Sequence, residues 1–287
     1  MKRREFLVNS ATGVSACWFA GSAAAPLAAA TTPPQLGAVT HSLLENWDLE
    51  KVIQVLERTG YAAVELRTEN KHGVEPSISK EERVRVRERF ARSKVRLLSF
   101  GTVCEFHSPD AAERRRQVEI GKTFIDLAHD TGAIGIKVRP EALPEGVPAE
   151  VTIEHIAGCL RELSDYGEPK NIEIWVEVHG PGTADPNVMA EMMEKTKRKN
   201  VGVCWNTNDT DVVNGSVKSG FDALRPWLKN IHMRDLTDKY PWHEFFGLIR
   251  SSGYSRYTLC EARGNPDGER LLKWYKALWT EYMNPCA

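Results

Sequence analysis

Polar side chains stand at the ends of four consecutive apolar runs in the second half of the chain. They are Glu177 and His179 in the run 172–179, Asn206 in 201–206, His232 and Arg234 in 231–234, and Glu261 in 257–262. Two carboxylates, one amide oxygen and one imidazole form a ligand set that suits a divalent cation. Buried carboxylates are also costly unless a cation compensates them. We therefore predict a metal site made of Glu177, Asn206, His232 and Glu261.

The first half of the chain adds further polar residues at corresponding places. Lys137 and Arg139 are two residues apart in the run 135–139, which places both on one face of a strand. The others are His41 (run 36–41), Glu65 (62–67), and Glu105 and His107 after the run 95–101. A single histidine of this kind is usually structural, but a core without a function would not collect so many polar groups.

These residues can converge only if the runs are neighbouring strands whose ends share one rim. Eight strands are predicted, at 36–41, 62–67, 95–101, 135–139, 172–179, 201–206, 231–234 and 257–262. Each is followed by a predicted helix, at 49–58, 80–93, 110–131, 151–166, 186–197, 217–224, 242–252 and 267–282. Eight such units in about 250 residues close a (β/α)8 barrel, in which function gathers at the C-terminal ends of the strands.

Local signals support several of the helix starts. The sequence Ser79-x-x-Glu82 predicts a capping box, and three pairs predict an N-cap followed by proline: Ser108-Pro109, Asp185-Pro186 and Asn265-Pro266. An open, doubly wound sheet is the competing fold. It would require a glycine-rich phosphate loop after the first strand, and the chain carries no GxGxxG or GxxxxGK[ST] pattern. We therefore expect a single barrel domain over residues 31–287.

The first thirty residues read as an export signal. Lys2, Arg3 and Arg4 precede a weakly apolar stretch that ends in Ala28-Ala29-Ala30, as in a twin-arginine signal peptide. This predicts a periplasmic or secreted protein with no stable membrane insertion after processing. A single membrane anchor and a lipid anchor through Cys17 are the less favoured alternatives.

Charge and cysteine content exclude further classes. With 38 Lys+Arg against 39 Asp+Glu, the chain lacks the basic surface that nucleic acid binding requires. The five cysteines beyond residue 30 are odd in number and contain no CxxC pair, which argues against a disulfide framework and a structural zinc site. We expect buried thiols.

Five motifs in order along the chain resemble the xylose-isomerase-like TIM barrels, a family of sugar isomerases, sugar-phosphate epimerases and inosose dehydratases. They are Gly-Tyr-Ala-Ala-Val-Glu-Leu at 60–66, Val-Glu-Val-His-Gly at 176–180, Val-Gly-Val-Cys-Trp-Asn at 201–206, Asn-Ile-His-Met-Arg-Asp at 230–235 and Tyr-Thr-Leu-Cys-Glu at 257–261. The resemblance covers residues 36–282. It implies that a Glu, an Asp, a His and a Glu bind one divalent metal. Asn206 stands where the family usually has Asp, and Asp209 or Asp211 is the alternative source of that charge.

The resemblance implies an isomerase or epimerase acting on a sugar or keto-sugar through an enediolate. In this reading one divalent ion binds, with Mn²⁺ favoured and Mg²⁺, Co²⁺ and Zn²⁺ left open. Glu177 and Glu261 would be the acid/base pair, assisted by Lys137. The expected substrate contacts are His41, Glu65, His107, Arg139, His179 and Arg234.

Other activities of the same fold start from the same kind of site. The first alternative is a lyase or dehydratase that eliminates from a 3-keto-glycoside or an inosose, and the second is a non-catalytic sugar-binding barrel. Endonuclease action at abasic DNA sites is disfavoured by the near-neutral charge and the few strand-end histidines. The expected partner is a small carbohydrate, not nucleic acid, and a homo-oligomer remains open.

Overall fold

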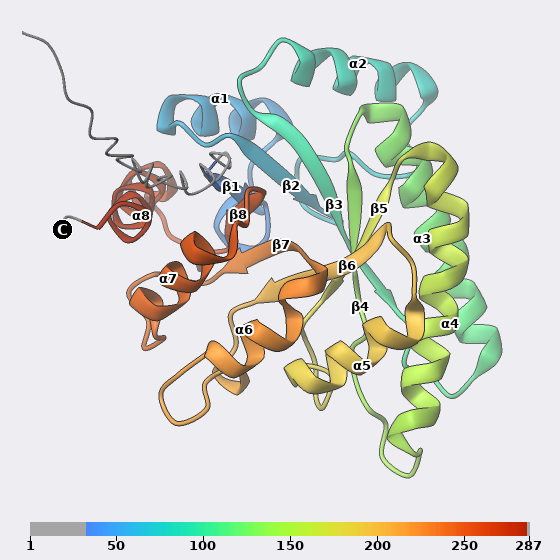
Figure 1. Cartoon of the computed structure of the whole chain (residues 1–287). Helices are drawn as coiled ribbons and strands as arrows, with labels where there is room; N and C mark the ends of the chain where they lie inside the picture. Colours follow the sequence, from blue (N-terminus) through green and yellow to red (C-terminus); the bar gives the residue numbers. More distant parts are fainter. Residues whose placement is uncertain (1–32, 286–287) are drawn as a thin grey trace, which may run out of the picture. The chain divides into compact units, whose positions relative to one another are not determined.

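The computed structural model describes residues 33–285. The predicted signal at 1–30, Cys17 and Cys286 lie outside the described residues. Eight parallel strands form a closed barrel in the order of the sequence. They are β1 Gln35–Val39, β2 Ala63–Arg67, β3 Arg96–Glu105, β4 Gly135–Arg139, β5 Glu173–Glu177, β6 Val201–Asn206, β7 Leu228–Met233 and β8 Tyr257–Cys260. Figure 1 shows their order along the chain.

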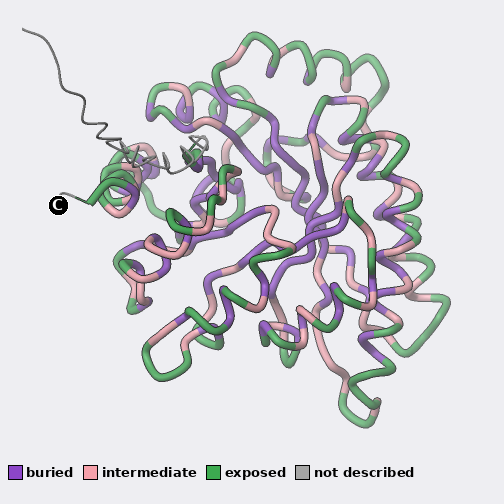
Figure 2. Tube along the Cα trace, viewed as in Figure 1, coloured by how far each residue is buried: buried purple, intermediate pink, exposed green. Residues whose placement is uncertain are grey.

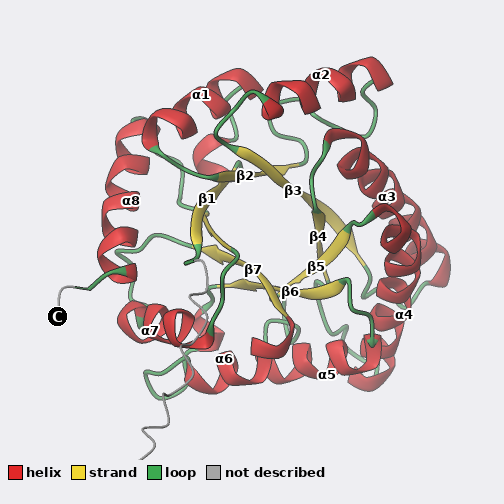
Figure 3. Cartoon of the chain, turned by 45° about the horizontal axis from the view of Figure 1, so that its top comes forward, coloured by secondary structure: helices red, strands yellow, loops and turns green. Residues whose placement is uncertain are grey.

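Eight α-helices surround the strands as an outer ring (Figure 3). They are α1 Leu49–Thr59, α2 Lys80–Ala91, α3 Ala111–Thr131, α4 Ala149–Gly167, α5 Pro186–Thr196, α6 Lys218–Leu224, α7 Trp242–Ser252 and α8 Gly268–Met283. The predicted (β/α)8 barrel is therefore confirmed for the described part of the chain. None of the helices in residues 33–285 is both long and apolar enough to cross a membrane.

Side-chain N-caps mark the starts of most helices, and two of the predicted N-caps differ from those in the structure. Ser79 and Glu82 form both bonds of the predicted capping box, and Asp185 caps α5 with Pro186 in its first turn. The predicted caps Ser108 and Asn265 are wrong. Asp110 and Asp267 accept the first backbone N–H bonds of α3 and α8 instead, because a carboxylate nearer the helix start satisfies those donors.

Two apolar layers hold the barrel. The larger layer lies between the strands and the helices, and a smaller one fills the barrel interior with Val39, Ala63, Leu98, Trp175, Cys204 and Leu259. Figure 2 shows the buried trace following the strands. Trp175 is wholly buried, and Gly135 makes room for it, since a Cβ at Gly135 would lie 2.9 Å from the indole ring. The interior below the strand ends is therefore packed, so ligands must enter from the rim.

The four described cysteines agree with the sequence-based expectation. Cys104, Cys159, Cys204 and Cys260 are buried free thiols. Burial raises the pKa of Cys204 to about 11 and that of Cys260 to about 12, so both remain protonated at neutral pH. They contribute to packing and not to a disulfide.

Candidate metal centre and substrate cavity

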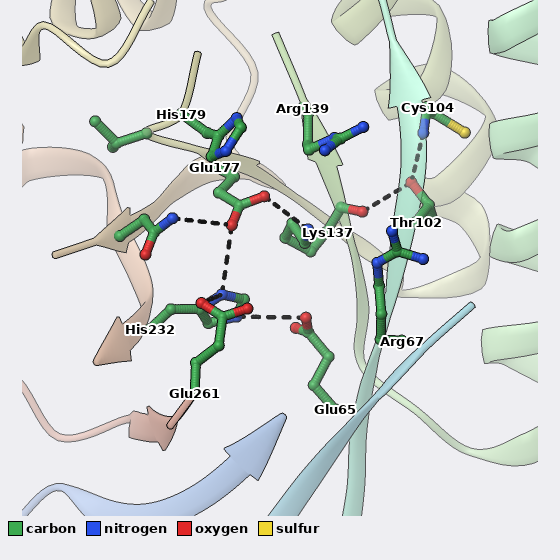
Figure 4. A network of polar contacts seen from close by, with 12 residues as sticks. Glu65, Arg67, Thr102, Cys104, Lys137, Arg139, Glu177, His179, His232 and Glu261 are labelled. Carbon is green, nitrogen blue, oxygen red and sulfur yellow. Dashed lines mark hydrogen bonds and ion pairs between the residues drawn. The ribbon is translucent and has the colours of Figure 1, made fainter. Parts of the chain in front are cut away.

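Two carboxylates and one imidazole meet at the C-terminal rim of the barrel (Figure 4). Glu177 ends β5, His232 lies in β7 and Glu261 directly follows β8. The Nδ1 atom of His232 lies 3.6 Å from Oε1 of Glu177 and 3.6 Å from Oε2 of Glu261. One ligand atom from each residue lies within 4.8 Å of the others. This nitrogen is buried and forms no hydrogen bond within the described residues. An unsatisfied nitrogen beside two carboxylate oxygens fits a divalent cation.

Asn206 occupies the fourth predicted ligand position, at the end of β6. Its Nδ2 donates to Oε1 of Glu177 at 3.3 Å, and half a turn about the Cβ–Cγ bond would present Oδ1 instead. The two alternative carboxylates point elsewhere. Asp209 pairs with Arg234 at 2.8 Å, and Asp211 is buried and accepts from the Tyr240 hydroxyl at 3.0 Å.

A buried ion pair joins the centre to β4. The Nζ atom of Lys137 donates to Oε2 of Glu177 at 2.7 Å. Burial opposes ionisation of Glu177, but the ammonium of Lys137 and the His232 ring outweigh it and hold the pKa of this carboxyl well below its usual value. Burial also opposes the charge of Lys137, while Glu177 and Glu65 keep its pKa above the usual value. Both groups are therefore charged at neutral pH.

Glu65 lies on the other side of the His232 ring. Its Oε1 is 3.3 Å from Nε2 of His232, and its Oε2 accepts from the hydroxyl of Ser99 at 2.7 Å. Burial disfavours the carboxylate, but the neighbouring His232 and Lys137 lower the pKa of Glu65 overall. Burial alone would lower the pKa of His232, whereas the carboxylates of Glu65 and Glu261 raise it well above its usual value. A cation at Nδ1 would have to displace a proton from this ring.

A cavity of about 280 Å³ opens beside the candidate metal centre, and Glu177 and Glu261 line it. Its lining consists of Val39, His41, Glu65, Arg67, Lys137, Arg139, Glu177, His179, Asn206 and Glu261. Arg139 pairs with Glu105 and, through Nε, with Glu141 at 3.3 Å. His179 Nδ1 lies 3.5 Å from the same Glu141 carboxylate. The wall of the cavity formed by the ends of β4 and β5 thus carries polar groups that can bind the oxygens of a ligand.

Gly180 allows this wall to form. It adopts φ +93°, and a Cβ there would lie 1.5 Å from the carbonyl oxygen of Glu141. Only glycine accommodates both the positive φ and this approach. The Glu141 backbone can therefore lie against Gly180, which keeps the Glu141 carboxylate beside His179.

The sequence model of the xylose isomerase-like TIM barrel family matches residues 53–278. The chain belongs to this family. It is 22% identical over 199 residues to the inosose isomerase of Bacillus velezensis, covering 68% of this chain and 70% of that protein.

Solved structures share the family fold. The IOLI protein with a bound zinc atom aligns with a TM-score of 0.73 at 17% identity, covering 87% of this chain and 98% of that one. The D-psicose 3-epimerase of Clostridium cellulolyticum H10 with D-tagatose aligns with a TM-score of 0.75 at 12% identity, covering 87% and 99%. At such identities the likeness concerns the fold.

The structure brings some of the predicted substrate contacts into the cavity lining and leaves others outside it. His107 does not line the cavity, because β3 continues to Glu105 and the chain then turns away through the buried Phe106. Arg234, which follows β7, does not line the cavity either and pairs with Asp209 and Asp238. Glu65 borders the cavity, yet it is 0% exposed and faces His232. His41, Arg139 and His179 do lie in the lining.

The sequence reading overlooked Arg67, the last residue of β2. It lines the cavity and donates to the Thr68 carbonyl at 2.7 Å. The alternation of side chains along a strand could have identified Arg67. It lies two residues after Glu65 and therefore on the same strand face, as Arg139 does relative to Lys137. Ser99 and Gly101 of β3 were also overlooked. Neither residue type signals a site, and it is the pairing of β3 with β2 that places both residues beside Glu65.

Proposed function

We propose that the protein is a divalent-metal-dependent isomerase or epimerase that moves a proton at a carbon next to the carbonyl of a sugar or keto-sugar. The observation that carries this proposal is the meeting of Glu177, Glu261 and His232 Nδ1 below a polar cavity. A divalent cation held by these residues, with Asn206 as a fourth ligand, would polarise the carbonyl and acidify the neighbouring C–H bond.

The two carboxylates are suited to remove and return the proton. Oε2 of Glu177 accepts a hydrogen bond from Lys137, and this contact keeps the Glu177 carboxylate ionised and fixes its orientation. Glu261 comes from a different strand end, and its side chain keeps 19% of its surface exposed. Two carboxyl groups at separate places on the rim can serve as base and acid in turn. His41, Arg139 and His179 would bind the sugar hydroxyls.

A second candidate function is elimination from a 3-keto-glycoside or an inosose. The specific support is Lys137, whose ammonium lines the cavity beside Glu177. After the same proton abstraction, an ammonium at this place could protonate a departing oxygen. Isomerisation conserves the mass of the substrate, whereas elimination releases water or a fragment.

One experiment separates these functions. The protein is incubated in D₂O with ketoses, 3-keto-glycosides and inososes, with Mn²⁺ or with a chelator, and products are followed by NMR and mass spectrometry. We expect cation-dependent deuterium incorporation next to a carbonyl, reduced at least about 100-fold in Glu261→Gln. The matched control Glu269→Gln, on the exposed α8 surface, should retain the wild-type rate. Sugar binding without any exchange in the presence of Mn²⁺ would overturn the proposal.

We also propose that the protein acts outside the cytoplasm after removal of residues 1–30. The support is the Lys-Arg-Arg start and the Ala28-Ala29-Ala30 segment of the sequence. N-terminal sequencing of the protein from its native host should find a start near residue 31. A chain that keeps Met1 and stays in the cytoplasmic fraction would contradict export.

A further inference from the structure

We propose that Glu65 is a positioning residue that determines which nitrogen of His232 faces the metal centre; this inference rests on the proposed metal-dependent function. Nε2 of His232 lies 3.3 Å from Glu65, while Nδ1 lies 3.6 Å from both Glu177 and Glu261. A neutral imidazole has one N–H donor and one lone pair. A carboxylate can only accept, so Glu65 favours the proton on Nε2 and leaves the Nδ1 lone pair for the cation.

Two residues of the neighbouring strand hold Glu65 in place. The hydroxyl of Ser99, which is itself wholly buried, donates to Oε2 of Glu65 at 2.7 Å. A Cβ at Gly101 would lie 2.7 Å from Oε1 of Glu65, so the absent side chain leaves space for the carboxylate. The register of β2 and β3 places Ser99 opposite Glu65. Ser99 thus fixes one carboxylate oxygen and Gly101 leaves the other turned to His232.

The unsatisfied atoms support this assignment. Oε1 of Glu65 and both ring nitrogens of His232 are buried without a hydrogen bond in the described residues. The Nε2–Oε1 separation of 3.3 Å exceeds the common N–H···O distance by only about 0.3 Å. A small ring movement therefore completes this bond, while Nδ1 remains directed at the two carboxylates. A wholly buried carboxylate is costly without such a partner.

The test measures cation affinity rather than activity. Mn²⁺ is titrated calorimetrically into the wild type and into Glu65→Gln, Ser99→Ala and Gly101→Ala. We expect the dissociation constant to rise about 10- to 100-fold in each variant. The matched control is Glu173→Gln, which removes a half-buried carboxylate that pairs with Lys229 and Arg256 at the other end of β5. It should destabilise the barrel and leave the Mn²⁺ affinity within about twofold of the wild type.

A second readout reports the tautomer directly in the wild type, and a variant is needed only to assign the signals. In the zinc-loaded protein with ¹⁵N-labelled histidines, the His232 signals, assigned with His232→Gln, should show the ring proton on Nε2. A ring proton on Nδ1, or wild-type affinity in all three folded variants, would overturn the positioning role. If the wild type binds neither Mn²⁺ nor Zn²⁺, the proposed metal-dependent function itself fails. If one variant does not fold, the Mn²⁺ affinities of the other two decide the question.

Discussion

Nζ of Lys137 lies 2.7 Å from Oε2 of Glu177, and each side chain is only 5% exposed. The two residues come from neighbouring strands, β4 and β5. The contact uses one oxygen of Glu177, while the other, Oε1, lies 3.6 Å from Nδ1 of His232. Glu177 therefore links two parts of the site: Lys137 sets its charge and orientation, and its remaining oxygen is available to the metal centre.

Replacing Lys137 by Met should leave Glu177 buried without its main partner. We expect the free energy of unfolding of the metal-free protein to fall by about 3 kcal/mol or more. The pKa of Glu177 should rise, because the favourable ammonium is lost while the burial remains. Cation binding and activity should then require a higher pH than in the wild type. Denaturant unfolding and the pH profile of Mn²⁺ affinity measure these changes.

A suitable control for Lys137→Met is Lys122→Met. Lys122 pairs with Glu119 and Glu162, whose side chains are 68% and 52% exposed, and such surface pairs contribute at most about 1 kcal/mol. An unshifted pH profile in Lys137→Met would show that the buried pair does not set the charge of Glu177.

Asp211→Asn should stabilise the protein at pH 8. Burial, opposed by bonds from Asn208 and Tyr240, raises the pKa of Asp211 to about 7. The carboxyl has a pKa of 3.8 in the unfolded chain and about 7 in the folded protein, so the folded state holds this proton more tightly than the unfolded state. The free energy of unfolding therefore falls as the pH rises from about 4 to 7. The Asn side chain of the variant does not ionise and so avoids this loss of stability. We expect the free energy of unfolding of the variant at pH 8 to be higher by between about 1 and 4 kcal/mol. The gain should vanish near pH 4, as denaturant unfolding at both pH values can show.

The same variant addresses the identity of the fourth ligand. Because Asp211 is directed at Tyr240 and not at Glu177, Asp211→Asn should bind Mn²⁺ as tightly as the wild type. A large loss of affinity would assign Asp211, and not Asn206, to the metal centre.

Asn206→Asp should tighten cation binding and slow the chemistry. The added carboxylate makes the ligand charge more negative, which attracts the cation but makes it a weaker Lewis acid. We expect about a tenfold lower dissociation constant for Mn²⁺ together with a lower kcat. Asn206→Leu, which removes the polar group, should weaken binding instead. Unchanged affinity in both variants would exclude position 206 from the metal centre.

Arg67→Met should weaken substrate binding without affecting the metal. Arg67 lines the cavity but makes no contact with Glu177, His232 or Glu261 among the described ion pairs. We expect KM to rise about tenfold, in line with the loss of a charge-assisted hydrogen bond, while the Mn²⁺ dissociation constant stays the same. An unchanged KM on the active substrate would remove Arg67 from the substrate site.

The barrel could be predicted from sequence because each strand and helix carries its own periodic pattern. The same period of two placed Lys137, Glu177, His179 and Glu261 at the rim. The period does not show which residues beyond a strand end still face the cavity. His179 and Glu261 follow the last residues of β5 and β8 and line the cavity, whereas Arg234, which follows β7, pairs with Asp209 and Asp238.

Direct side-chain contacts such as that of Glu65 with His232 could not be predicted from the sequence. The register of β3 shifts between Gly101 and Glu105, which brings Glu105 opposite Arg139 and carries His107 beyond the cavity. The contact of Glu65 with His232 joins two strands that are far apart in the barrel order. Such contacts depend on barrel closure, so a local pattern identifies the residue but not its partner.

The most direct test of the metal centre is a crystal structure of the protein grown with Mn²⁺, with anomalous scattering recorded at the manganese edge. Our account predicts one strong peak between the carboxylates of Glu177 and Glu261 and Nδ1 of His232, and no such peak in Glu261→Gln crystals. A wild-type structure whose manganese lies elsewhere, or whose triad carries no anomalous peak at saturating Mn²⁺, would contradict it.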